Sequence, residues 1–256
     1  MSYVIPDPRF EMPELLIPGR KPKGKVTVDQ SHPLGRKMTG CWLFNHTYKD
    51  VVSGKTMSTS PCSGTYNAPA FAFDEGDPCV HIDATADRLL YPSARLIPSL
   101  DFTIAVIASP KEKDGNSGLV HIDGANSISY FRCYWGSDGL MDIFLGGRSS
   151  TNQGTDVTTL NKQLISFSSI YGNGNQQYVF QNGTKLIDST NTAGPDLTNS
   201  AHYLHIGTLT VDSSACGSVF NQTDCYYHAV MIWDRAFTEA EHRELYKNPY
   251  QFLIPA

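Results

Sequence analysis

The stretch Tyr178-Val-Phe-Gln-Asn-Gly-Thr184 decides the fold class of this 256-residue chain. Asn182 and Gly183 readily adopt the two positive-φ positions of a type I′ turn, which matches the right-handed twist of paired strands. The aromatic and β-branched residues before the turn favour extended backbone. The stretch therefore predicts a β-hairpin whose first strand covers residues 177–181.

Outward from this hairpin, the chain from Gly40 onward consists of short apolar runs separated by Gly, Asn, Asp and Ser. Such runs, bounded by turn formers, indicate strands, and Tyr171-Gly-Asn-Gly-Asn175 predicts a second, looser hairpin. The pattern is typical of an all-β sandwich or jelly roll of two antiparallel sheets. We expect strands at residues 40–45, 79–83, 101–109, 119–123, 127–135, 140–145, 163–171, 177–181, 203–207 and 225–233.

One short helix is expected after the last strand. Thr238 followed by Glu241 has the pattern of a capping box, in which the threonine oxygen accepts from the N3 amide and the glutamate reaches back. The helix should end where Asn248 precedes Pro249, because proline disfavours helical backbone in the residue before it.

Residues 1–39 differ in composition and predict an extended arm ahead of a domain over residues 40–256. They contain six prolines and the basic cluster Arg20-Lys-Pro-Lys-Gly-Lys25. Proline fixes φ and lacks the backbone N–H, which disfavours helices and central strands. The arm is either a solvated tail or a segment that lies across a neighbouring subunit, and its apolar anchor favours the second. The candidate partner-binding residues are Leu15, Leu16, Ile17, Pro18, Arg20 and Lys21.

Composition and charge exclude several function classes. The 20 Lys+Arg against 25 Asp+Glu give a net charge of −5 without a basic block, so nucleic acid is not an expected partner. No apolar run reaches about 18 residues, so no membrane-spanning helix is expected. The N-terminus lacks the features of a secretory signal, which predicts synthesis in the cytoplasm. The six cysteines contain no Cys-x-x-Cys pair, which argues against a structural zinc site or a redox motif. Three disulfides are possible, but nothing marks the chain for an oxidising compartment, which favours reduced thiols, with Cys133 buried in a strand.

The C-terminal third resembles laminin G and concanavalin A-like jelly-roll domains of lectins and glucanases. The matching features are the Asn-Gly hairpin, the strand Leu204-His-Ile-Gly207 and the last strand leading into the helix. The two ends, over residues 31–44 and 245–255, are similar to those of such domains in tailed-bacteriophage virion proteins. The resemblance implies a jelly-roll sandwich and a place in a virion. It does not fix the function, because this fold serves enzymes, lectins and scaffolds.

The positions of the glutamates argue against an enzyme. The jelly-roll glucanases that the chain resembles carry Glu-x-Asp-x-x-Glu on one strand, and glycoside hydrolysis usually needs two facing carboxylates. This chain has no glutamate between residues 113 and 238. Glu75-Gly-Asp77 lacks the third carboxylate, and the glutamates after Thr238 fall on the expected helix, where they complement its dipole. An aspartate pair stays open.

Other ligands have weaker support in the sequence. The tetrapeptide Val-His-Ile-Asp at residues 80–83 and 120–123 could present a metal site if the strands were neighbours, but chance repetition is the simpler interpretation. Aromatics in residues 133–136 and at 226–227 could stack on sugars, although strand aromatics more often pack in a core. Asp114, Asp212 and Asp224 have no spacing that singles out calcium. We therefore name no catalytic, metal, cofactor or glycan-binding residue.

The sequence thus predicts a non-enzymatic structural protein of a phage virion, such as a capsid decoration or cement protein. Its arm would bind capsid or tail subunits, and the protein would form a homo-oligomer in the particle. The alternative is a lectin-like adhesin that recognises host-surface glycans, and a glycoside hydrolase comes third.

Overall fold

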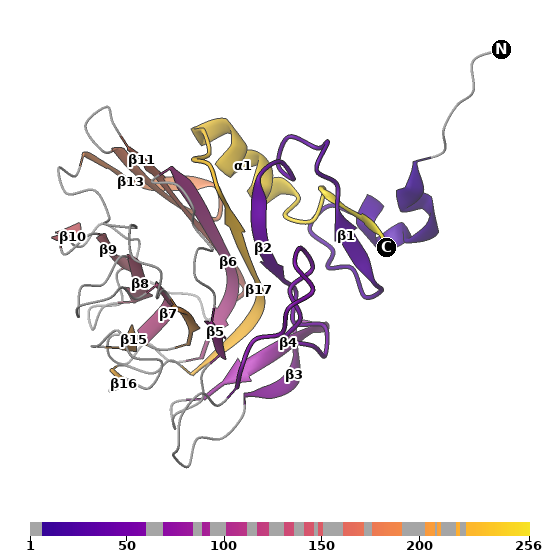
Figure 1. Ribbon diagram of the computed structural model, residues 1–256, viewed down its shortest axis with the longest axis horizontal. Coiled ribbons are helices and arrows are strands. Elements are labelled where there is room, and N and C mark those ends of the chain that lie inside the picture. The colour runs from indigo at the N-terminus through magenta and orange to yellow at the C-terminus, as the bar shows by residue number, and fades with distance from the viewer. Residues whose placement is uncertain are drawn as a thin grey trace.

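The computed structural model describes residues 7–59, 69–83, 89–92, 101–111, 117–122, 131–135, 141–145, 148–150, 161–171, 176–190, 203–207, 209–210, 219–220 and 224–256. Two main antiparallel sheets face each other, as Figure 1 shows. The larger sheet has eight strands in the order β13-β12-β11-β6-β17-β4-β3, with β2 also paired to β17. Its strands are β2 (Met38–Trp42), β3 (Ala70–Asp74), β4 (Asp77–Ile82), β6 (Phe102–Pro110), β11 (Gln163–Ile170), β12 (Gln176–Gln181), β13 (Thr184–Thr190) and β17 (Cys225–Trp233).

The smaller sheet has six strands in the order β10-β9-β8-β7-β14-β5. They are β5 (Leu89–Pro92), β7 (Ser117–Ile122), β8 (Phe131–Trp135), β9 (Met141–Leu145), β10 (Arg148–Ser150) and β14 (Tyr203–Ile206). The remaining elements are β1 (Val26–Val28) paired with β18 (Leu253–Pro255), β15 (Leu209–Thr210) paired with β16 (Val219–Phe220), the 3-10 turns η1 (Pro8–Glu11) and η2 (Pro13–Leu16), and the helix α1 (Glu239–Lys247). The predicted fold class, an all-β jelly-roll sandwich with a short C-terminal helix, is confirmed. No helix among the residues described meets the length and apolarity needed to cross a membrane.

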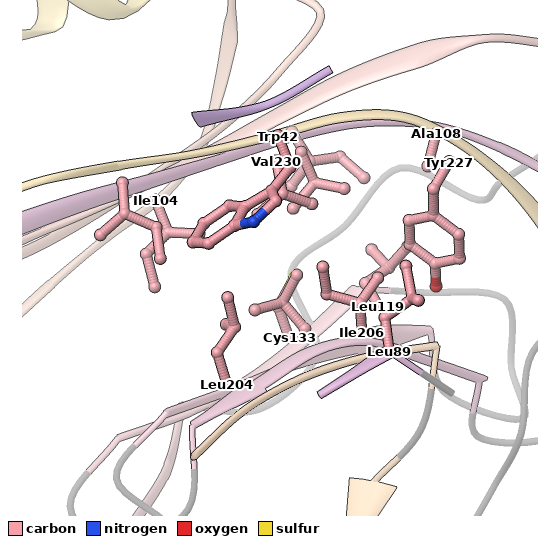
Figure 2. Close-up of a cluster of buried hydrophobic side chains, with 14 of the residues drawn as sticks. Trp42, Leu89, Ile104, Ala108, Leu119, Cys133, Leu204, Ile206, Tyr227 and Val230 are labelled. Atoms are coloured by element: carbon pink, nitrogen blue, oxygen red, sulfur yellow. The ribbon is translucent and has the colours of Figure 1, made fainter. Parts of the chain in front are cut away.

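The main core lies between the two sheets (Figure 2). Trp42 and Ile104 project from the larger sheet toward Leu204 of the smaller one, and all three are at most 2% exposed. Cys133 projects into the same core as a buried thiol, as the sequence predicted. Removing this apolar surface from water stabilises the sandwich by about 25 cal/mol per Å².

The central strands of the larger sheet are buried on both faces. Along β6, Ile104 faces the space between the sheets, whereas Ala105 and Ile107 join a second apolar cluster on the outer face. That cluster includes Trp233 from β17 and Leu245 from α1. This explains why both alternating sets of residues in β6 are apolar or small, since a sheet covered on both sides needs no polar face.

The two local signals at the ends of the fold are confirmed. Asn182 and Gly183 have φ values of 50° and 76° and connect β12 to β13 in an antiparallel hairpin. At α1, Thr238 Oγ1 accepts from the Glu241 amide at 3.3 Å, and the Glu241 carboxylate accepts from the Thr238 amide at 2.9 Å. This reciprocal pair is the predicted capping box.

The N-terminal segment does not form the extended arm that its prolines predicted. Residues 8–16 form two 3-10 turns, because proline is tolerated at the first positions of a helical turn. β1 pairs with the chain's own β18, so Val26 lies opposite Pro255. Part of the segment that we expected to bind a partner thus pairs with a strand of the same chain.

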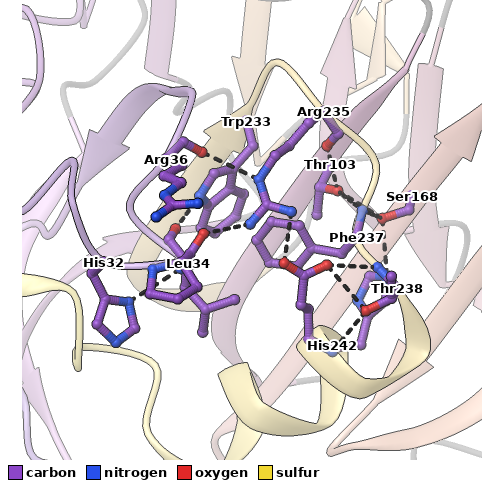
Figure 3. Close-up of polar contacts among 12 residues, drawn as sticks. His32, Leu34, Arg36, Thr103, Ser168, Trp233, Arg235, Phe237, Thr238 and His242 are labelled. Carbon is purple, nitrogen blue, oxygen red and sulfur yellow. Dashed lines mark hydrogen bonds and ion pairs between the residues drawn. The ribbon is translucent and has the colours of Figure 1, made fainter.

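Hydrogen bonds further along attach residues 32–36 to the end of β17 (Figure 3). Trp233 Nε1 donates to the Leu34 carbonyl at 2.6 Å. The Arg235 guanidinium donates to the Pro33 carbonyl at 2.7 Å and forms an ion pair with Glu241 at 2.7 Å. The segment from Lys21 onward is therefore part of the folded body.

Gly207, which directly follows β14, provides a test of the packing between the two sheets. It has a φ of 83°, and a Cβ there would lie 2.6 Å from Ile82 of the facing sheet. We expect Gly207→Ala to lower the free energy of unfolding by about 2–4 kcal/mol, from left-handed strain plus overpacking. Gly76→Ala is the matched control, because Gly76 has a φ of 81° but no heavy atom within 4 Å of the added carbon. Urea unfolding of both variants measures the difference, and equal losses would contradict the contact with Ile82.

Candidate functional site

Four aromatic side chains, three of them exposed and one partly buried, gather at the edge of the larger sheet that β3 forms. We call this group the aromatic platform, and it consists of His46, Tyr48, Phe71 and Phe73. Tyr48 and Phe71 are stacked, with ring centroids 4.6 Å apart and an interplanar angle of 21°. His46 lies against both phenylalanines, at 5.9 Å from Phe71 and 5.4 Å from Phe73. Phe71 is 39% and Phe73 66% exposed, so the platform presents ring surface to solvent.

The edge position of β3 explains why two phenylalanines are exposed together. β3 ends the strand order of the sheet, and Phe71 and Phe73 lie two residues apart, hence on one face of the strand. β3 turns into β4 through Glu75 and Gly76, whose φ values of 49° and 81° are those of a type I′ turn. The hairpin is thus a rigid support for the two rings.

Ion pairs hold this hairpin against the body. Lys162, just before β11, donates to Asp77 at 2.8 Å, and its amide donates to the Glu75 carboxylate at 3.2 Å. At the end of β3, the Asp74 carboxylate accepts a hydrogen bond from the ring of the buried His228 at 3.0 Å. These contacts fix both sides of the turn, so β3 has little freedom to move relative to β4 and β17.

The other half of the platform comes from a strained turn after β2. Phe44 and His46 have φ values of 53° and 56°, a region that non-glycine residues enter at a cost. Phe44 is fully buried and anchors this turn in the core. The Tyr48 hydroxyl donates to the Pro69 carbonyl at 2.5 Å, which fixes the Tyr48 ring beside Phe71. Such strain is retained when the surrounding contacts determine the conformation, and it often accompanies a binding site.

A second polar group lies behind the hairpin, where His228 contacts both Asp74 and Ser109. The Asp74 carboxylate and the Ser109 hydroxyl approach the same ring nitrogen of His228, at 3.0 Å and 3.3 Å. A nucleophilic triad needs the acid and the serine on opposite nitrogens, and Ser109 is only 2% exposed. Burial lowers the pKa of His228 to about 4, with repulsion from Lys21 and Lys162 adding to the effect. The group fits a structural role in attaching β3.

The two Val-His-Ile-Asp tetrapeptides do not form a shared site in the part of the chain that the structure describes. His81 lies on β4 of the larger sheet and pairs with Asp224 at 2.7 Å. His121 lies on β7 of the smaller sheet, opposite His205 of β14. Asp123 lies outside the described residues. Within the described ranges, no group of three or more His, Cys, Asp or Glu side chains could hold a metal ion.

The glutamates and the other suggested ligands are placed as follows. Glu239, Glu241 and Glu244 lie on α1, and all three pair with basic side chains. Glu112, Asp114 and Asp212 lie outside the described residues, as does part of the 133–136 stretch. Tyr227 is buried in the core and donates to the Gly118 carbonyl, so this suggested sugar-stacking residue is a packing residue.

The six arm residues that we expected to bind a partner divide into two sets. The prediction is wrong for Leu15, which is 2% exposed, and for Lys21, which is fully buried. Leu15 packs in the outer apolar cluster, and Lys21 Nζ donates to the Pro78 carbonyl at 2.5 Å. The exposed residues of this segment are Leu16, Ile17, Pro18 and Arg20.

The sequence analysis missed the platform, although a signal for half of it was present. Phe71-Ala-Phe73 alternates as a strand does, and Glu75-Gly76 occupies the place of a hairpin turn. The contact with His46 and Tyr48 joins segments more than 20 residues apart and has no local signal.

Comparison with solved structures supports the fold. Domain 4 of AbnA, a GH43 extracellular arabinanase from Geobacillus stearothermophilus in complex with arabinotriose, has a TM-score of 0.61 and 13% identity, covering 82% of this chain and 98% of that chain. A mutant of Trypanosoma rangeli sialidase displaying trans-sialidase activity has a TM-score of 0.61 and 14% identity, covering 96% of this chain and 38% of that chain. The chain thus spans little more than a third of the sialidase. No protein-family model and no curated protein sequence matches it.

These identities show a shared fold and nothing further. The neighbours are β-sandwich domains of arabinanase and sialidase structures, which are related to the lectin-like jelly roll. The fold that the sequence resemblance implied is therefore supported. Neither of the two structures named above is a phage protein.

The pH dependence of stability tests whether the Lys21 side chain is buried. Burial lowers the pKa of its ammonium group from 10.5 to about 7, with Asp77 opposing this in part. A lysine with a lowered folded-state pKa contributes stability above its unfolded pKa, and this contribution is lost as the pH falls toward the folded pKa.

Between pH 7 and pH 9, we therefore expect the free energy of unfolding to rise by up to about 1.4 kcal/mol per pH unit from this group. Lys21→Met should remove that part of the slope, whereas Lys23→Met, at an exposed neighbour, should not. Chemical denaturation at several pH values measures both. An unchanged slope in Lys21→Met would contradict the burial of the charge.

Proposed function

We propose that this chain is a non-enzymatic carbohydrate-binding protein whose aromatic platform packs against the ring of a sugar. One observation carries the proposal: four aromatic rings gather at a rigid sheet edge, and three of them, His46, Phe71 and Phe73, are exposed. A contiguous exposed apolar patch is uncommon on a protein surface and marks an interaction site. The C–H face of a sugar ring is apolar, and aromatic side chains supply large contact area with few rotatable bonds.

The ligands of two neighbouring structures support the proposal that the ligand is a sugar. One of them holds arabinotriose and another holds 2,3-difluorosialic acid. All four platform residues lie in the described part of the chain, where β3 itself carries one carboxylate. Asp74, the nearest carboxylate of β3, contacts His228 and lies on the opposite face from Phe73. Binding without hydrolysis is therefore the proposed activity.

The platform predicts a specific loss of binding. We expect Phe71→Ala and Phe73→Ala each to weaken glycan binding about five- to thirtyfold, corresponding to about 1–2 kcal/mol of lost contact. Tyr171→Ala is the matched control, because Tyr171 is 51% exposed but lies at the far end of β11. A glycan array followed by calorimetry on the sugars that bind gives the measurement. Equal glycan binding by all three variants, with the fold intact, would exclude the platform as the glycan-binding site.

The same experiments separate the platform from an assembly surface. An edge strand with exposed phenylalanines could also pair with a second copy of the chain. Sedimentation of the wild type and of Phe73→Ala reports this. A dimer that is lost in the variant, with no glycan bound by the wild type, would assign the patch to self-association instead.

The second candidate, a phage virion component, rests on the resemblance of the two ends and on a separate apolar patch. We call this the arm patch: Phe10, Leu16 and Ile17, which are 68%, 41% and 45% exposed. Side chains of this kind are usually covered in an assembled protein. On this proposal, the arm patch binds a capsid or tail subunit, and the platform faces outward toward host-surface glycans.

The arm patch is tested by surface substitution. Deleting residues 1–30 would also remove β1 and the buried Leu15, so a deletion would confuse attachment with folding. We expect the triple variant Phe10→Ser, Leu16→Ser, Ile17→Ser to keep its thermal unfolding midpoint but to lose incorporation into particles. The exposed Arg20→Ser serves as control. Incorporation of the triple variant at the wild-type level would rule out this attachment.

A further inference from the structure

A groove of about 680 Å³ lies between the N-terminal segment and the turn after β2. Its size falls within the range of small-ligand sites. We call it the lysine groove. Three exposed lysines from two segments line it, above a floor of apolar side chains. The lysines are Lys23, Lys25 and Lys49, and the floor is formed by Val26, Leu43 and Val51.

Among the described residues, the three lysines form no ion pair, although the Glu14 carboxylate accepts from the backbone amide of Lys23 at 3.3 Å. In the parts of the chain that the structure describes, no carboxylate lies within 4.0 Å of their ammonium groups, whereas Lys162, Lys185 and Lys247 all form ion pairs. Asp50 is the acidic residue in the described lining. Its carboxylate accepts from the amides of Cys41 and Val52 at 2.7 Å and 3.0 Å, and it is only 1% exposed. Asp50 is thus hydrogen-bonded to the backbone and keeps its negative charge, so the three lysines and one aspartate of the lining sum to 3 − 1 = +2.

The lysine groove and the aromatic platform share one segment of chain. Asn45, Thr47 and Lys49 line the groove, whereas His46 and Tyr48 between them belong to the platform. The strained turn at Phe44 and His46 therefore sets the position of both surfaces. The groove and the platform are therefore joined by one short segment of the chain.

We propose that the lysine groove binds the carboxylate or sulfate groups of an acidic oligosaccharide, so that the glycan recognised by this protein is anionic. This inference rests on the proposed function and narrows its ligand class. Apolar floor and cationic rim together suit a charged sugar, because its C–H faces pack on the floor while its anionic groups pair with the lysines. An inorganic anion would leave the apolar floor unused.

The test uses sugar chains that differ in charge alone. The full-length protein is titrated by calorimetry with oligogalacturonate and with its fully methyl-esterified, uncharged counterpart. A second pair, dextran sulfate and dextran, distinguishes sulfate from carboxylate. We expect the charged member to bind about tenfold more tightly, as three exposed ion pairs allow. The preference should vanish in about 0.5 M salt, where exposed charges are screened.

Lysine variants test whether the groove causes the preference for charged sugars. The triple variant Lys23→Gln, Lys25→Gln, Lys49→Gln should bind charged and uncharged sugars equally. Lys55→Gln is the matched control, since Lys55 is exposed in the same turn but does not line the groove. All four lysines are on the surface, so the variants should keep the wild-type unfolding midpoint.

The possible outcomes separate the two proposals. Equal binding of charged and uncharged sugars by the wild type, with loss in Phe71→Ala, overturns the anionic preference and leaves the platform standing. No binding of any sugar overturns both. Equal affinity for polyglutamate and oligogalacturonate overturns the assignment to a sugar and points to an acidic peptide.

Discussion

Strand β17 is the element on which the rest of the structure depends. It pairs with β6 along its length, and on its other side it pairs with β4 at its start and with β2 at its end. Its side chains enter both cores, with Val230 between the sheets and Met231 in the outer cluster. A strand in this position has its backbone groups satisfied on both sides and its apolar area buried on both faces. Anything that displaced β17 would open both cores.

The outer face of the larger sheet combines an apolar region with buried, hydrogen-bonded histidines. Near α1, His242 is buried between Ser166 and Ser168, at 2.7 Å and 2.9 Å, and stacks on Phe180 at 4.4 Å. Burial lowers the pKa of His242 to about 3, so the imidazole is neutral at ordinary pH and both of its nitrogens are engaged. At the opposite end of the sheet, His228 attaches β3. One buried histidine thus fixes the helix, and the other supports the hairpin that carries the platform.

The sequence predicts the parts of this fold that are specified locally. The Asn182-Gly183 turn, the Thr238 capping box and the whole of β17 need no distant partner to be recognised, and they are confirmed. The short strands β1 and β18 carry no such signal, because three residues are too few for a pattern and they pair across the full length of the chain. Prolines indicate where helices are disfavoured, but they do not reveal whether a segment covers its own domain or another subunit.

Burial of Lys21 could not be predicted for a similar reason. A lysine in a basic, proline-rich stretch usually lies in solvent. Its side chain is covered here because the N-terminal segment lies across β4, where the Pro78 carbonyl accepts a hydrogen bond from the Lys21 ammonium group. The aromatic platform was partly predictable, since the alternation of Phe71 and Phe73 ahead of a Glu-Gly turn is a strand signal. Its completion by Tyr48 depends on tertiary packing.

The same packing decides where a ligand can bind. Among the described residues, the space between the two sheets is filled by large side chains such as Trp42 and Tyr227. The proposed sugar binding therefore has to use the edges and turns of the sandwich. The β3 edge suits this use, because its rings are already held by Lys162, His228 and the Tyr48 hydroxyl before any ligand arrives. Little conformational entropy remains to be lost on binding, and affinity follows from contact area and charge. The strain at Phe44 and His46 is consistent with this arrangement, since it places an aromatic and a cationic surface on neighbouring residues of one turn.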